Sequence, residues 1–121
     1  MAHVAGCQSA DLIARGGDPV SDETISAFSD VIARRVTREP LQHILGTTEF
    51  YGLDFLSDAR ALIPRPDSEI VVEAALAHIP EGQPVFVADL GTGSGCLLSA
   101  ILAHRPEASG EGVEASPEAA A

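Results

Sequence analysis

Three glycines and two acidic residues form the pattern in this sequence with the clearest potential for chemistry. Gly91, Gly93 and Gly95 lie in the segment VADLGTGSGCLLSAIL, between an apolar run typical of a strand and one typical of a helix. Asp89 ends the first strand, and Glu114 ends a second expected strand further along the chain. Glycine tolerates positive φ and has no Cβ, and a helix N-terminus has unpaired N–H groups. The turn would therefore let a ligand approach the backbone closely.

The two acidic residues predict which ligand this turn binds. A carboxylate at the end of the second strand, here Glu114, can accept hydrogen bonds from both ribose hydroxyls of a nucleoside. Asp89 beside the turn favours a ligand with positive charge and no phosphate, because ammonium and sulfonium groups are attracted to a nearby anion. S-adenosylmethionine meets both requirements. The alternative is structural, with the glycines forming only a tightly packed turn and Glu114 serving as a solvated surface acid.

Other ligand classes fit the pattern less well. The dinucleotide fingerprint requires glycine or alanine at position 96, where this chain has Cys96, so an NAD-linked oxidoreductase is disfavoured but stays an alternative. A phosphate-binding P-loop requires a lysine, and the sequence contains none. The histidines and the cysteines Cys7 and Cys96 are not spaced as zinc ligands. We therefore expect no metal site.

Composition limits the class of protein further. The formal net charge of −11 comes from 18 acidic residues against seven arginines, so no basic face is available for direct binding to nucleic acid. No apolar run approaches the roughly 20 residues that cross a bilayer. The N-terminus lacks the pattern of a secretory signal. We therefore expect no membrane association and a cytoplasmic protein.

The first third of the chain is expected to be helical. Residues 1–20 are predicted to be weakly structured, because they have no sustained periodicity apart from ADLIARGG, which could form one or two helical turns that end at glycine. Ser21 is a good N-cap for a helix that runs to about Val36. A short second helix is expected to start near Pro40 and to end at Gly46. The apolar stripe predicted for the longer helix consists of Ile25, Phe28, Ile32 and Val36.

A hairpin and another helix are expected next. The segment TTEFYGLDFLSD has β-favouring residues on both sides of Gly52, which predicts a β-hairpin. Asp67 can cap a helix over SEIVVEAALAHI, and Pro80 and Gly82 end it. The apolar stripe predicted for this helix consists of Ile70, Val71, Ala74, Ala75 and Ile79.

The remaining segments predict a βαβ unit around the glycine turn. PVFVADL is typical of a strand buried on both faces of a parallel sheet. SGCLLSAILAHR would be its crossover helix, and GEGVEAS would begin the next parallel strand. SPEAAA resembles the first turn of another helix. The order of elements predicts the α/β class.

Three segments together resemble a known family. REPLQHILGTTEFYGLDF, ALIPRPDSEIVVEAAL and VADLGTGSGCLLSAILAHRPEASGEGVEASPEA are similar, in this order and spacing, to the release-factor glutamine methyltransferases. Members of that family transfer a methyl group from S-adenosylmethionine to a glutamine side-chain amide of peptide chain release factors. The resemblance, which covers about residues 31–120, implies that Glu114 holds the ribose, although the family usually has aspartate there. The residues that it places along the cofactor or near the active-site cleft are Gly91, Thr92, Gly93, Ser94, Gly95, Arg65 and Pro66.

The resemblance also implies a domain organisation. Residues 1–45 would be part of a helical substrate-recognition region, residues 46–62 a β-hairpin linker, and residues 63–121 the N-terminal part of the methyltransferase domain. That domain would be the truncated start of a Rossmann-like S-adenosylmethionine-dependent methyltransferase sheet. Arg65 would either shape the pocket or serve as a structural tie.

Catalysis in the family depends on a motif that this sequence lacks. The motif is Asn-Pro-Pro-Tyr, and the chain contains no asparagine. We therefore expect a fragment of such an enzyme that is inactive by itself and binds its cofactor weakly. A remnant that binds S-adenosylmethionine without turnover is the alternative.

Overall fold

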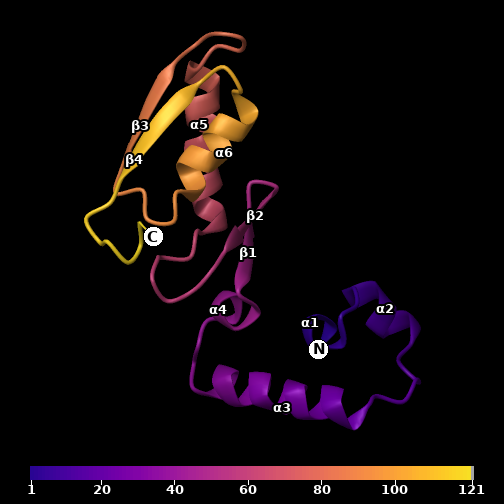
Figure 1. Ribbon diagram of the computed structural model, residues 1–121. Helices are drawn as coiled ribbons and strands as arrows, with labels where there is room; N and C mark the ends of the chain where they lie inside the picture. Colours follow the sequence, from indigo (N-terminus) through magenta and orange to yellow (C-terminus); the bar gives the residue numbers. More distant parts are fainter. Residues whose placement is uncertain (121) are drawn as a thin grey trace. The chain divides into compact units, whose positions relative to one another are not determined.

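The computed structural model describes residues 1–120 as a mixed α/β chain with two separate two-stranded sheets (Figure 1). The chain divides into two units, an all-helical one over Met1–Leu45 and a second that begins at Gly46 and contains both sheets. In the part that the structure describes, every helix is too short or too polar to cross a membrane.

The first unit begins with two short helices, α1 (Ala2–Ala5) and α2 (Ser9–Ala14). The helical turns predicted within ADLIARGG are confirmed by α2, whereas α1 was not expected in a segment predicted to be weakly structured. A capping box starts α2, in which the Gln8 N–H donates to Asp11 Oδ2 at 2.9 Å. This local pairing supports a helix that is too short to show a period in the sequence.

Helices α3 (Asp22–Val36) and α4 (Leu41–Leu45) follow, as predicted. The expected cap of α3 is confirmed, because Ser21 Oγ accepts a hydrogen bond from the Thr24 N–H at 3.2 Å. Its predicted apolar stripe, in contrast, is largely exposed, and Val36 has 76% of its surface accessible. The periodicity thus predicted the position of the helix correctly, but the apolar face that it predicted is not buried in a core.

Arginine side chains connect the end of α3 to the start of α4. Arg34 Nε donates to Glu39 Oε2 at 2.8 Å, and Arg35 Nη1 donates to the Glu39 carbonyl oxygen at 3.0 Å. The hydrogen bond from Arg34 lowers the pKa of the Glu39 carboxyl from its ordinary value. Because the pair is solvent-accessible, its contribution is mainly to the geometry of the connection.

The predicted hairpin is confirmed as β1 (Thr47–Phe50) and β2 (Leu53–Leu56), paired antiparallel. Its two-residue turn has positive φ at both positions, 51° at Tyr51 and 74° at Gly52. Turns of this kind match the right-handed twist of the flanking strands. The Tyr51 N–H donates to Glu69 Oε1 at 3.0 Å, which fastens the turn to the next helix.

That next helix, α5 (Glu69–His78), begins later than the sequence predicts. A short 3-10 turn, η1 (Pro66–Ser68), precedes it, and Ser68 occupies the N-cap position of α5. The prediction that Asp67 caps the helix is therefore wrong. Pro66 has a fixed φ that suits the first residue of a helical turn, so the chain starts to coil one residue before Asp67.

The buried face of α5 also differs from the predicted stripe. Val72 is fully buried, whereas Ile70 and Val71 are 67% and 52% exposed. The residues that face the core are Val72, Ala75, Leu76 and Ile79. The helix is apolar almost all round, so periodicity alone could not select the face that packs.

The βαβ unit is confirmed as β3 (Phe86–Leu90), α6 (Cys96–His104) and β4 (Ser109–Val113). The strands pair in parallel register, with Phe86 opposite Ser109 and Leu90 opposite Val113. Helix α6 packs on both strands, and α5 packs on α6 (Figure 1).

The expectation that β3 is buried on both faces is wrong. Phe86 is 61% exposed and Leu90 is 80% exposed, while Val87 between them is partly buried. This alternation arises because side chains along a strand point to opposite faces, and α6 packs against one of them.

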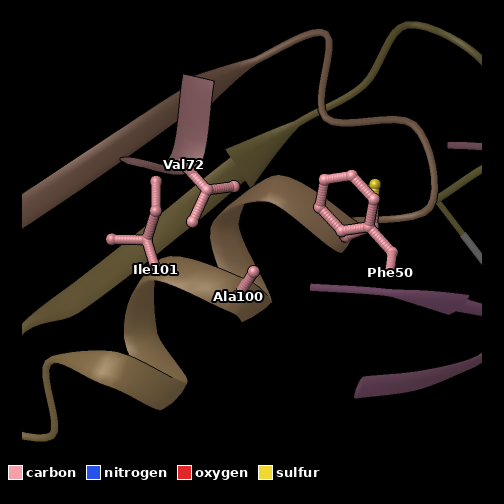
Figure 2. Packing of buried hydrophobic residues seen from close by; sticks show 5 residues of the cluster. Phe50, Val72, Ala100 and Ile101 are labelled. Atoms are coloured by element: carbon pink, nitrogen blue, oxygen red, sulfur yellow. The ribbon is translucent and has the colours of Figure 1, made fainter. Parts of the chain in front are cut away.

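The core of the second unit joins the hairpin to the helices (Figure 2). Phe50 of β1 is 1% exposed and Ala100 of α6 is fully buried, as is Val72 of α5. Figure 2 shows Ile101 beside Val72 and Phe50 at the other end of the cluster. The hairpin is thereby part of the same packed structure as the βαβ unit.

The Arg105 side chain binds backbone carbonyl groups at the C-terminal ends of α5 and α6. Its Nε donates to the Ile79 carbonyl oxygen at 2.8 Å, and its Nη2 donates to that of Leu76 at 2.7 Å. Its Nη1 donates to the carbonyl oxygen of His104 at 2.8 Å. These carbonyl groups have no further partner within a helix, so the guanidinium satisfies them.

Val71 and Val72 are neighbours on α5 that differ in burial, so they allow a matched test of which face of the helix packs in the core. Val72→Ala removes a fully buried side chain, and we expect it to lower the free energy of unfolding by about 2 kcal/mol. Val71→Ala makes the same chemical change on the same helix at a half-exposed site and should cost under about 0.5 kcal/mol. Urea unfolding followed by circular dichroism measures both. Equal losses for the two variants would show that the packed face is assigned wrongly.

Candidate cofactor-binding site

The glycine turn between β3 and α6 has the backbone conformation that its sequence predicts. Gly91, Gly93 and Gly95 have φ values of 79°, 56° and 74°. A side chain at any of these positions would be strained, since only glycine adopts positive φ without cost. The turn is anchored to β4, because the N–H groups of Gly91 and Thr92 donate to the Val113 carbonyl oxygen at 2.7 and 3.1 Å.

Glu114, directly after β4, binds the same turn through its carboxylate. Oε2 accepts a hydrogen bond from the Gly93 N–H at 2.8 Å. Oε1 accepts from the N–H groups of Ala115 and Ser116 at 2.8 and 3.0 Å. Hydrogen bonds from Ser116 and Gly93 lower the pKa of the Glu114 carboxyl from its ordinary value, because they stabilise its charged form. The structure thus brings the predicted acid and the predicted turn together.

Asp89, at the end of β3, fixes the turn from the other strand. Its Oδ2 accepts a hydrogen bond from Thr92 Oγ1 at 2.7 Å, and the pair is partly buried. Thr92 is therefore held on both sides, by its backbone to β4 and by its hydroxyl to β3. The two carboxylates that the sequence analysis selected both contact the turn that they were expected to frame.

Two glycines of β4 complete this arrangement, and the sequence analysis missed them. A Cβ at Gly112 would lie 2.8 Å from both Cγ2 and Oγ1 of Thr92. A Cβ at Gly110 would lie 2.7 Å from Leu98 Cδ1 and 2.8 Å from the Val87 carbonyl oxygen. Glycine inside a strand often marks such a close approach, so the alternating pattern SGEGV was the available signal.

A cavity of about 180 Å³ lies between the glycine turn and the segment that contains IPRP. Arg65 is part of its lining, as are Thr92 and Ser94, whereas Pro66, Asp89 and Glu114 are outside it. The lining consists of Leu62, Ile63, Pro64, Arg65, Ser68, Gly91, Thr92, Gly93, Ser94, Cys96 and Leu97. Residues from 62–68 and from 91–97 thus meet at one hollow, as expected when loops at the same end of a sheet converge.

Ser94 connects this hollow to a larger one. It also lines a cavity of about 300 Å³ together with residues 54–58 and residues 60–64. Its hydroxyl oxygen is buried, and no described residue forms a hydrogen bond with it. A buried hydroxyl without a partner is unusual and costs free energy unless a ligand or water satisfies it.

The described residues contain no cluster of three or more histidine, cysteine, aspartate or glutamate side chains that could hold a metal ion. Cys96, the first residue of α6, is buried and has a free thiol. The donors that the site offers are backbone N–H groups, hydroxyls and carboxylates. These groups suit an organic ligand with hydroxyl and amino functions.

The lowered pKa of Glu114 generates a test of its contact with the turn. The ionised carboxylate accepts the bonds, so the tie is present above the ordinary glutamate pKa and is lost as the pH falls through the lowered value. We expect the amide shifts of Gly93 and Ser116 to titrate together in ¹⁵N NMR spectra, with a midpoint below the ordinary pKa of a glutamate. Glu114→Gln should abolish this transition. A transition that persists in that variant would assign it to another group.

Comparisons with known proteins identify relatives of this chain. The family model described as the PrmC N-terminal domain matches residues 1–46. A protein of Geobacter sulfurreducens is 48% identical over 103 residues, which is 85% of this chain and 36% of that relative. A protein of Rhodospirillum rubrum is 45% identical over 97% of this chain and 36% of its own length. The Escherichia coli relative is 38% identical over 97% of this chain and 42% of its own length.

All three relatives carry the name release factor glutamine methyltransferase. The chain spans well under half the length of each of them. The similarity extends from the helical first unit through the glycine turn, and it agrees with the three segments singled out in the sequence. The resemblance of this chain to the release factor glutamine methyltransferase family is therefore confirmed over most of its own length.

Proposed function

We propose that this chain provides the S-adenosylmethionine-binding part of an enzyme that methylates a glutamine side-chain amide of peptide chain release factors. One observation carries the proposal, namely the Glu114 carboxylate hydrogen-bonded to the glycine turn at the ends of two parallel strands. The names of the relatives support the reaction and the protein substrate. On this proposal the βαβ unit is the start of a Rossmann-like methyltransferase sheet.

The residues of the turn have distinct roles in this proposal. Gly91 to Gly95, including Thr92 and Ser94, present backbone and hydroxyl groups to the cofactor. Glu114 accepts hydrogen bonds from the ribose hydroxyls with the lone pairs that its backbone contacts leave free. Asp89 supplies negative charge for the sulfonium and ammonium groups. When bound, S-adenosylmethionine provides the methyl group and a sulfur leaving group.

We also propose a separate role for each of three segments of the chain. Residues 1–45 contribute to recognition of the release factor, residues 46–62 connect the two parts, and residues 63–121 begin the methyltransferase domain. The match of the PrmC N-terminal domain to residues 1–46 supports the first boundary. The change from an all-helical unit to one that contains strands occurs at the same place, after Leu45.

Methyl transfer to an amide requires accurate orientation of the nucleophile. The amide nitrogen forms a bond to the methyl carbon as the carbon–sulfur bond breaks, S-adenosylhomocysteine leaves, and the nitrogen loses a proton. The lone pair must lie in line with the methyl group, and much of the rate comes from this alignment. The family uses an asparagine for it, and this sequence has none. Cofactor binding without turnover is therefore the expected behaviour of the 121-residue chain.

The binding proposal is tested by titrating the ¹⁵N-labelled chain with S-adenosylmethionine. We expect the amide signals of Gly91, Gly93 and Gly95 to shift, with a dissociation constant in the high-micromolar range or weaker, about −5 kcal/mol or less favourable. NAD at the same concentrations should leave them unchanged. Glu114→Ala should weaken binding further, whereas Glu111→Ala, an exposed acid on the same strand, should not. Shifts confined to residues outside the turn would refute the proposed site.

Catalysis is tested with labelled cofactor and a purified release factor. We expect the 121-residue chain to transfer no methyl group above the background of a reaction without protein, because no asparagine is present to orient the amide. Mass spectrometry of the release factor identifies any modified glutamine. Transfer to glutamine by this chain would show that one of its own residues positions the amide.

A further inference from the structure

The three arginines of the second unit differ in what they contact. Arg60 pairs with Asp58, with Nη2 2.8 Å from Oδ2. Arg105 donates to carbonyl oxygens at the ends of α5 and α6. Arg65, in contrast, uses no side-chain nitrogen in a hydrogen bond or ion pair with any residue between 1 and 120. It is thus a cation without an internal partner in a strongly acidic chain.

The backbone holds Arg65 beside the glycine turn. It lines the 180 Å³ cavity together with Gly91, Thr92 and Gly93. Prolines on both sides restrict the chain here, and Arg65 has an extended backbone with φ −105° and ψ 145°. Its carbonyl oxygen accepts the Ser68 N–H at 2.9 Å, which locks it to the start of η1. The restricted backbone therefore fixes where the Arg65 side chain starts, beside the cavity, and the exposed side chain is free to reach a ligand there.

Two further features of the same cavity favour an anion. The hydroxyl of Ser94 is buried and lacks a partner among the described residues. The first turn of α6, a helix of nine residues, contributes Cys96 and Leu97 to the lining and contains no acidic side chain. No side chain of that first turn neutralises the partial positive charge of the helix end, although the Glu114 carboxylate binds the Gly93 N–H in the turn before the helix. A guanidinium, a hydroxyl and a helix N-terminus together make a set of donors suited to a carboxylate.

We propose that Arg65 binds the α-carboxylate at the methionine end of S-adenosylmethionine. This inference rests on the proposed function and deepens it, because it assigns a direction to the cofactor. The ribose lies toward Glu114 after β4, and the amino-acid end lies toward Arg65 and the start of α6. With a net charge of −11 the chain repels carboxylates in general. A single free cation at the cavity therefore selects for a ligand that carries one carboxylate at this end.

The proposal predicts discrimination between two ligands that differ in one group. Decarboxylated S-adenosylmethionine keeps the adenosine, the sulfonium and the ammonium but lacks the carboxylate. The two compounds are titrated into the ¹⁵N-labelled chain and into its Arg65→Gln variant. We expect wild type to prefer S-adenosylmethionine by about tenfold, as for a charged hydrogen-bonded pair. In Arg65→Gln the preference should disappear or reverse, because the remaining charge of the site is negative.

Two variants control for charge and for folding. Arg60→Gln makes the same change in net charge in the same unit and should keep the preference. Arg65→Lys keeps the charge without the planar fork and should retain part of it. The amide spectrum without ligand shows whether each variant keeps the fold.

Each outcome separates this inference from the proposed function. If Arg65→Gln lowers the affinity for both ligands equally, Arg65 has a structural role. The inference is then wrong, but the proposed cofactor site is not contradicted. If wild type binds both ligands equally well, the carboxylate is not recognised and the inference is again wrong. If neither ligand shifts the amides of the glycine turn, the proposed function itself fails and this inference fails with it.

Discussion

The hydrogen bond between the Glu114 carboxylate and the Gly93 N–H is the contact on which the candidate site depends. It joins the end of β4 to the turn that follows β3, so the two strand ends act as one rigid rim. The close approach of Gly112 to Thr92 is possible only without a side chain at position 112. A carboxylate that accepts hydrogen bonds from backbone N–H groups in this way leaves these groups paired and holds the turn against the end of β4.

Packing in the core brings the second wall of the cavity to this rim. Phe50 of the hairpin, Val72 of α5 and Ala100 of α6 are buried in one cluster. The hairpin and α5 bracket the segment that contains IPRP, so their packing against α6 fixes where that segment runs. The absence of a larger side chain at Ala100 allows the elements to approach closely. The cavity between Arg65 and the glycine turn is thus a consequence of the core.

Charge then distinguishes the two ends of this site. Asp89 and Glu114 place negative charge at the strand ends, outside the cavity, while Arg65 contributes a positive charge to the cavity lining. A ligand with hydroxyls at one end, a cation in its centre and a carboxylate at the other end matches this order. The opposite orientation would place like charges together, which is unfavourable in a partly desolvated cavity. On the proposed function, this distribution of charge would orient S-adenosylmethionine as well as hold it.

The sequence by itself determined the local elements and the tertiary structure decided how they are used. Helix α3, the hairpin, and the order of β3, glycine turn, α6 and β4 were predictable, because caps, turn residues and periodicity act over a few positions. Tertiary packing selected Val72 over Ile70 on α5, since an almost uniformly apolar helix has no preferred face until a partner covers one. It also left one face of β3 exposed and Arg65 without a side-chain partner among residues 1–120. These properties depend on which distant residues meet, and that information is not carried by any single segment of the chain.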